Sequence, residues 1–86
     1  MLKIKEGKSR LTVDDEIMIS ICRRILPDCD SVADFHKELI QVGQHLLRKD
    51  KTENLYNVTE EAGTLTIWHL SPGGKAARAV ITISDN

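Results

Sequence analysis

Large aromatic side chains are scarce in this sequence of 86 residues, because Phe35, Tyr56 and Trp68 are the only ones and make up 3% of it. Hydrophobic residues still amount to 41%, so the core must consist of Ile, Leu, Val and Ala. No apolar run approaches the ~20 residues of a membrane-spanning helix, and the first residues lack the apolar stretch of a signal peptide. We therefore expect a cytoplasmic protein that folds as a single domain over residues 1–86 around one modest core.

The sequence also has few cysteines and a small net charge. Two isolated thiols, Cys22 and Cys29, form neither a disulfide framework nor a zinc site, which indicates a reducing compartment. Asp28 and Asp30 flank Cys29 and should raise the pKa of its thiol, so Cys29 is a poor nucleophile. At a net charge of −1, the strong positive field that drives non-specific nucleic-acid binding is absent overall, and a local basic patch is the alternative left open.

No constellation of residues indicates catalysis, a cofactor or a metal. His36 and His45 point in opposite directions, since their spacing separates them by about 180° around a helix. His69 is expected on the inner face of a sheet, as a core or boundary histidine. The segment Gly73-Gly74-Lys75 lacks the spacing of a phosphate-binding loop, and no helix follows it. We expect no enzymatic activity, no cofactor, no metal and no small-molecule substrate.

The first amphipathic helix is expected to begin after Thr12. Thr12 can cap the free backbone N–H groups, with Asp15 three residues on in a variant of the capping box. Pro27 should end this helix near Leu26. Its apolar stripe is expected at Val13, Ile17, Ile21 and Ile25, with Met18 and Cys22 beside them.

The second helix is expected to begin after Ser31 and to run to about Arg48 or Lys49. Gly43 lies inside it and lowers its helix propensity by roughly 1 kcal/mol relative to Ala. Its apolar residues recur every three or four positions, at Val32, Phe35, Leu39, Val42 and Leu46.

Alternating apolar and polar residues predict three strands, Leu55–Thr59, Thr64–Leu70 and Ala76–Ser84. Helices followed by strands indicate an α+β fold. We expect two antiparallel helices packed on one face of a three-stranded antiparallel meander, with the short segment Leu2–Lys5 able to add a fourth, N-terminal strand.

The loop between the last two strands decides which side chains face each other. A five-residue loop, Ser71 to Lys75, pairs Ile67 with Ala79 on the inner face and Trp68 with Arg78 on the outer face. A four-residue loop would instead put Ile67 opposite Arg78 and mix the two faces. The sequence therefore predicts that Trp68 and Arg78 are neighbours on the outer face.

This outer face is the candidate partner-binding surface. Aromatic and arginine side chains are common anchors of protein interfaces, and an aromatic ring can also stack on single-stranded bases. The alternative is a cross-strand pair that only stabilises the sheet, by ~0.5–1 kcal/mol. The candidate residues are Trp68, Arg78, Val80, Leu70 and Lys75.

We expect a small protein-interaction or regulatory module whose partner is another protein or a second copy of itself, as a homodimer. No membrane partner is expected. The order of two helices followed by a hairpin resembles the end of a winged-helix domain, which implies the alternative of a nucleic-acid-binding regulator using the 71–75 loop. Nucleic acid is the less favoured partner, because the region around the start of the second helix, where a recognition helix meets DNA, carries acidic residues. These residues are Asp28, Asp30, Asp34 and Glu38.

Overall fold

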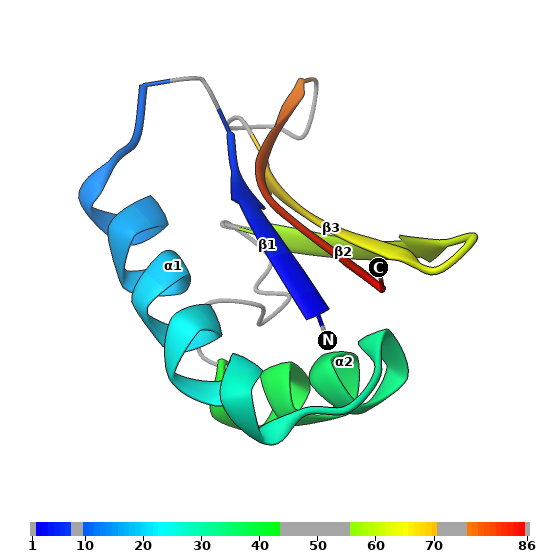
Figure 1. Cartoon of the computed structure of the whole chain (residues 1–86). Helices are drawn as coiled ribbons and strands as arrows, with labels where there is room; N and C mark the ends of the chain where they lie inside the picture. Colours follow the sequence, from blue (N-terminus) through cyan, green and yellow to red (C-terminus); the bar gives the residue numbers. More distant parts are fainter. Residues whose placement is uncertain (1, 8–9, 44–55, 71–75, 86) are drawn as a thin grey trace.

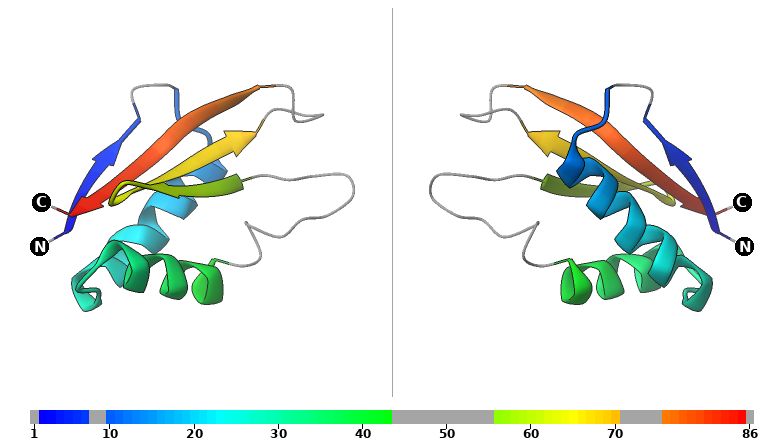
Figure 2. Two further views of the ribbon diagram at one scale, coloured as in Figure 1. Left: turned by 90° about the vertical axis from the view of Figure 1, so that its right-hand side faces the viewer. Right: turned by 90° about the vertical axis from the view of Figure 1, so that its left-hand side faces the viewer.

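The computed structural model describes residues 2–7, 10–43, 56–70 and 76–85. Four strands form one antiparallel sheet in the order β1-β4-β3-β2, and both helices lie on one face of it (Figures 1 and 2). The predicted α+β architecture is confirmed, and the N-terminal segment supplies the fourth strand. The elements are β1 (Leu2–Glu6), α1 (Val13–Ile25), the 3-10 turn η1 (Leu26–Asp28), α2 (Val32–Val42), β2 (Tyr56–Glu61), β3 (Thr64–Leu70) and β4 (Ala77–Asp85).

Helix α1 begins with the predicted capping box. The Thr12 hydroxyl accepts a hydrogen bond from the Asp15 backbone N–H at 3.1 Å, and the Asp15 carboxylate accepts one from the Thr12 N–H at 2.9 Å. The helix ends at Ile25, and Pro27 follows within η1. Leu26 keeps helical angles (φ −54°, ψ −45°), but Pro27 has no N–H to continue the ladder of α-helical hydrogen bonds.

The buried face of α1 differs from the predicted stripe. Val13 and Ile17 are 73% and 42% exposed, so the prediction that they belong to the core is wrong. The helix turns a neighbouring face toward the sheet, and this face includes one ionisable side chain. Its buried residues are Asp15, Met18, Ile19, Cys22 and Ile25.

Helix α2 is capped by Ser31, whose hydroxyl accepts a hydrogen bond from the Asp34 N–H at 3.1 Å. The helix ends at Val42 with Gly43 as its C-cap, and the Gly43 N–H donates to the Leu39 carbonyl oxygen at 2.7 Å. The predicted continuation covers residues 44–49, which lie outside the described residues. Val32, Phe35 and Leu39 are buried as predicted, and the helix packs against β3 and β4.

Strands β3 and β4 do not pair in the predicted register. Ile67 lies opposite Ile81, whereas Trp68 lies opposite Ala79, so a bulge leaves Val80 as an extra residue in β4. Val80 and Ile81 are consecutive and both fully buried, which a regular ladder does not allow because its side chains alternate between faces. The ladder ends at the pair of Leu70 and Ala77, so residues 71–76 connect the strands, one more than predicted.

Strand β1 joins the sheet beside this bulge. Its pairing with β4 begins at Leu2 and Asp85, and beyond the strand the Gly7 N–H donates to the Val80 carbonyl oxygen at 2.6 Å. A β-carbon on Gly7 would lie 2.2 Å from the Ala79 carbonyl oxygen. Only glycine lets the two backbones approach this closely.

The core between the sheet and the helices is mainly aliphatic, as predicted. Leu65, Ile67, Ile81 and Ile83 from the sheet are fully buried. Phe35 is the only fully buried aromatic side chain among the described residues. No helix within these ranges combines the length and the apolar character needed to cross a membrane.

Candidate functional site

The outer face of the sheet, defined as the face turned away from α1 and α2, carries the predicted tryptophan. Trp68 lies between Asn57 of β2 and Ala79 of β4, and its indole N–H donates to the Thr59 hydroxyl at 2.9 Å. The side chain is partly exposed. The prediction of a partly exposed Trp68 on this face is confirmed, but its neighbour in β4 is Ala79 rather than Arg78.

The structure does not bring the other predicted site residues together on one surface. Leu70 shares the outer face with Trp68, since both follow the alternation of β3. Val80 is fully buried, so its predicted outward position is wrong, and the bulge is the reason. Arg78 lies opposite His69 on the inner face, so its predicted position is wrong as well. Lys75 lies outside the described residues.

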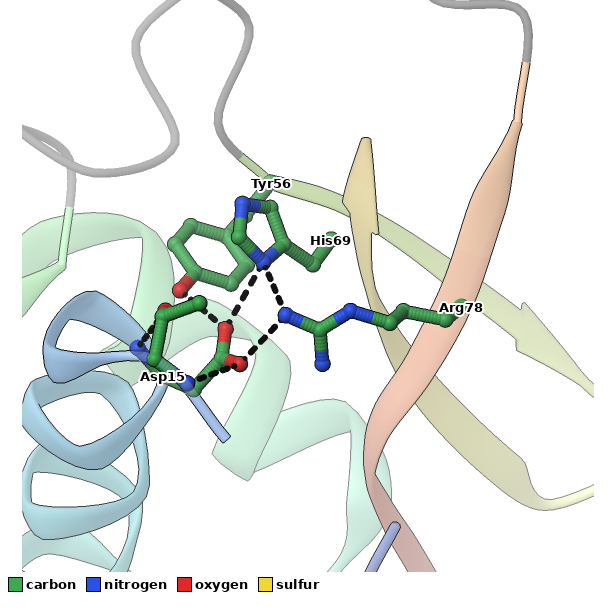
Figure 3. A network of polar contacts seen from close by, with 5 residues as sticks. Asp15, Tyr56, His69 and Arg78 are labelled. Atoms are coloured by element: carbon green, nitrogen blue, oxygen red, sulfur yellow. Dashed lines mark hydrogen bonds and ion pairs between the residues drawn. The ribbon is translucent and has the colours of Figure 1, made fainter. Parts of the chain in front are cut away.

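Arg78 instead belongs to a polar cluster between α1 and the sheet, the Asp15 cluster, made of Asp15, Tyr56, His69 and Arg78 (Figure 3). Asp15 is completely buried. Its Oδ1 accepts a hydrogen bond from the Tyr56 hydroxyl at 2.6 Å, and its Oδ2 accepts one from Arg78 Nη2 at 2.6 Å. One carboxylate therefore joins the first turn of α1 to strands β2 and β4.

His69 lies between the Asp15 carboxylate and the Arg78 guanidinium of this cluster. Its Nδ1 lies 2.9 Å from Asp15 Oδ1 and 2.7 Å from Arg78 Nη2, and its ring stacks on Tyr56 with a centroid separation of 4.8 Å. The imidazole is 18% exposed, and its other ring nitrogen points away from Asp15 (Figure 3). The prediction of a boundary histidine on the inner face is confirmed.

The electrostatics favour an ionised Asp15. Burial raises the pKa of this carboxyl, but the hydrogen bonds from Tyr56, Thr12 and Arg78 outweigh it and lower the pKa to about 2. Burial and the bond to Asp15 raise the pKa of the Tyr56 phenol. Tyr56 is thus a neutral donor to a charged acceptor, which makes a strong hydrogen bond.

These contacts limit what the cluster can do chemically. A carboxylate that accepts hydrogen bonds from Thr12, Tyr56 and Arg78 has little capacity left to act as a base. Arg78 Nη1 is buried and has no hydrogen-bond partner among the described residues, which costs stability. Among the described residues, no group of three His, Cys, Asp or Glu could hold a metal ion.

Both cysteines are buried free thiols. Burial raises the pKa of Cys22 to about 12. The pKa of Cys29 is also raised, first by burial and then by the nearby carboxylates that include Asp28 and Asp30. The predicted direction for Cys29 is confirmed, and neither thiol has the depressed pKa of a nucleophile.

Sequence reasoning identified Asp15 as a helix-capping residue but missed its partners. The available signals were an arginine in the middle of an apolar strand and the Ala79-Val80-Ile81 run, which breaks the alternation and is typical of a bulge. Comparison of the chain with protein-family models, curated proteins and solved structures finds no match.

Proposed function

We propose that this chain is a small cytoplasmic protein-interaction or regulatory module, without enzymatic activity, that binds another protein through the outer face of its sheet. The supporting observation is the position of Trp68. The described helices cover only the inner face (Figure 2), whereas the one tryptophan of the chain lies on the outer face, where its indole N–H donates to the Thr59 hydroxyl. A rigid, partly exposed tryptophan is the kind of side chain that anchors protein interfaces.

The Asp15 cluster has a structural role in this proposal. Its carboxylate is buried and saturated with hydrogen bonds, and Cys22 and Cys29 are buried thiols with raised pKa values. The described residues thus offer no activated nucleophile beside His69. Two free thiols also agree with a cytoplasmic location.

Nucleic acid is the alternative partner and has less support. Asp34 lies in the first turn of α2 and carries the wrong charge for a helix that meets a phosphate backbone. Among the described residues, the outer face has two lysines, Lys3 and Lys5, but both lie on the edge strand β1. A single basic edge gives a weak electrostatic footprint.

Site-specific photo-crosslinking tests the proposal. A photoreactive phenylalanine analogue would replace Thr66, which lies in the middle of the outer face opposite Thr82, in cells that naturally make the chain. The matched control carries the same analogue at the exposed Glu38 of α2. We expect protein crosslinks at position 66 that are absent at position 38 and that are lost in the Trp68→Ala variant.

Equal crosslinking at both positions, or none at position 66, would overturn the proposal. Crosslinks to nucleic acid at position 66 would favour the alternative. Crosslinks to another copy of the chain would identify the partner as the protein itself.

A further inference from the structure

The register of the sheet places opposite charges at the two ends of one row on the outer face. The pairings of β1 with β4, β4 with β3 and β3 with β2 align one residue from each strand. The row consists of Lys3, Ser84, Thr64 and Glu61. Lys3 and Glu61 are exposed, and neither forms an ion pair within the described part of the chain. The face thus has a basic edge and an acidic edge.

From this arrangement we infer that the partner of the outer face is a second copy of the chain, related by a two-fold axis that runs parallel to the strands between β3 and β4. This inference rests on the proposed function and names its partner. Rotation about that axis lays β1 over β2 of the second copy and β3 over β4. Lys3 then faces Glu61 of the second copy, and Glu61 faces Lys3, so both ends of the row are paired.

Side-chain sizes match in the same arrangement. Trp68 and Ala79 are opposite each other in one row, and Leu70 and Ala77 in the next. The rotation places Trp68 over Ala79 of the second copy and Leu70 over its Ala77. A large side chain therefore meets a small one in each case, which is how two packed sheets interdigitate.

The other two-fold axis in the plane of the interface is unfavourable. An axis perpendicular to the strands would lay β1 over β1 and β2 over β2. Lys3 and Lys5 would then lie against the same basic edge of the second copy, and Glu61 against the same acidic edge. Like charges brought together across an interface oppose binding, so charge favours the parallel axis over the perpendicular one.

The dimensions of the face predict a weak dimer. Sheets pack about 10 Å apart, a gap that lysine and glutamate side chains can bridge from opposite sides. Four strands of this length present roughly 400 Å² per copy, about half of the ~800 Å² that each partner contributes to a standard interface. We expect a dissociation constant in the micromolar range or weaker, sensitive to salt.

A charge-exchange experiment tests the pairing. The variants Lys3→Glu and Glu61→Lys each place like charges at both ends of the row, so each alone should dimerise at least ten-fold more weakly than the original chain in analytical ultracentrifugation. A mixture of the two variants restores both opposite-charge contacts. At one end of the row the introduced glutamate meets the introduced lysine, and at the other end the unchanged Glu61 meets the unchanged Lys3. The mixture should therefore form a heterodimer at least as tightly as the original chain dimerises.

The matched controls are Lys37→Glu and Glu38→Lys, which make the same changes on exposed positions of α2 and should leave dimerisation unchanged. Circular dichroism verifies that each variant is folded, and Lys3→Gln with Glu61→Gln replace any variant that is not. A chain that stays monomeric at millimolar concentration, or a mixture that fails to associate, overturns the inference. If crosslinks from position 66 then identify a different protein, the proposed function stands without the dimer.

Discussion

His69 lies opposite Arg78 across the β3–β4 ladder, and its Nδ1 is 2.7 Å from Arg78 Nη2. The same Nδ1 is 2.9 Å from Asp15 Oδ1. A single ring nitrogen can accept a hydrogen bond from Arg78 or donate one to Asp15, but it cannot do both. The position of one proton on the imidazole therefore determines which of the two contacts is a hydrogen bond.

We predict that neutral His69 carries its proton on Nε2. The Arg78 guanidinium is always protonated and needs an acceptor, whereas the imidazole can place its proton on the nitrogen that points away from Asp15. Nitrogen-15 chemical shifts of the imidazole, measured by NMR, distinguish the two tautomers. In the Arg78→Ala variant Nδ1 should become the protonated nitrogen and donate to Asp15. A protonated Nδ1 in the original chain would contradict the prediction.

The Asp15→Ala substitution should destabilise the fold by about 3 kcal/mol. It removes the acceptor of Tyr56, Thr12 and Arg78, and breaking a buried ion pair costs about 3–5 kcal/mol. The lower end of this range applies because the Arg78 side chain is 30% exposed and water can solvate part of the orphaned charge. Urea unfolding measures the change. Glu16→Ala, at an exposed position of the same helical turn, is the control and should cost about 0.5 kcal/mol or less.

Stability should fall in acid because of Asp15. Its pKa is lowered from 3.8 to about 2 in the folded chain, so the carboxylate stabilises the fold above about pH 4. That contribution, roughly 2 kcal/mol, is lost as the pH falls from about 4 to about 2. Urea unfolding between pH 5 and pH 2 should show a smaller loss for Asp15→Asn than for the original chain. A Glu16→Gln control should keep the original profile, and identical profiles for all three proteins would contradict the assignment.

The Gly7→Ala substitution should destabilise the junction of β1 and β4 by roughly 2 kcal/mol, as expected for overpacking. The new β-carbon would lie 2.2 Å from the Ala79 carbonyl oxygen, and backbone atoms cannot move away cheaply. Gly43→Ala is a suitable comparison, because its nearest atom, the Leu39 carbonyl oxygen, is 3.1 Å away. Thermal unfolding should place Gly7→Ala well below Gly43→Ala, and equal transition temperatures would refute the argument.

The elements and their order followed from local signals, and the hairpin register did not. The Thr12 capping box, the Ser31 cap and the alternation in β3 are properties of neighbouring residues, so the sequence indicates them directly. The register of β4 depends on a bulge at Val80. The bulge reverses the faces of the residues between the start of β4 and Val80. A regular ladder is the simpler hypothesis, and it assigned Arg78 and Val80 to the wrong face.

Of the two candidate sites, the one that depends on local alternation was predicted, and the one that depends on long-range contacts was not. Trp68 was placed correctly on the outer face, because the extra residue of the bulge lies in β4 and the alternation of β3 up to Trp68 is unbroken. The Asp15 cluster joins residues that are far apart in the chain, and composition gives no indication that a first-turn aspartate is buried. The capping role alone accounts for that charge, so the sequence gives no reason to expect a second partner for it.

Asp15 has two structural roles, and they cannot be separated. As the N3 residue of the capping box it closes the first turn of α1, and as the partner of Arg78 it fixes that turn to β4. Helix ends normally fray independently of the rest of a fold, but here opening the first turn would also release a buried ion pair. The hydrogen-bonded amide protons of Thr12, Asp15 and Glu16 should consequently exchange with solvent only when the whole domain unfolds, so that the start of α1 and the centre of the sheet form one cooperative unit.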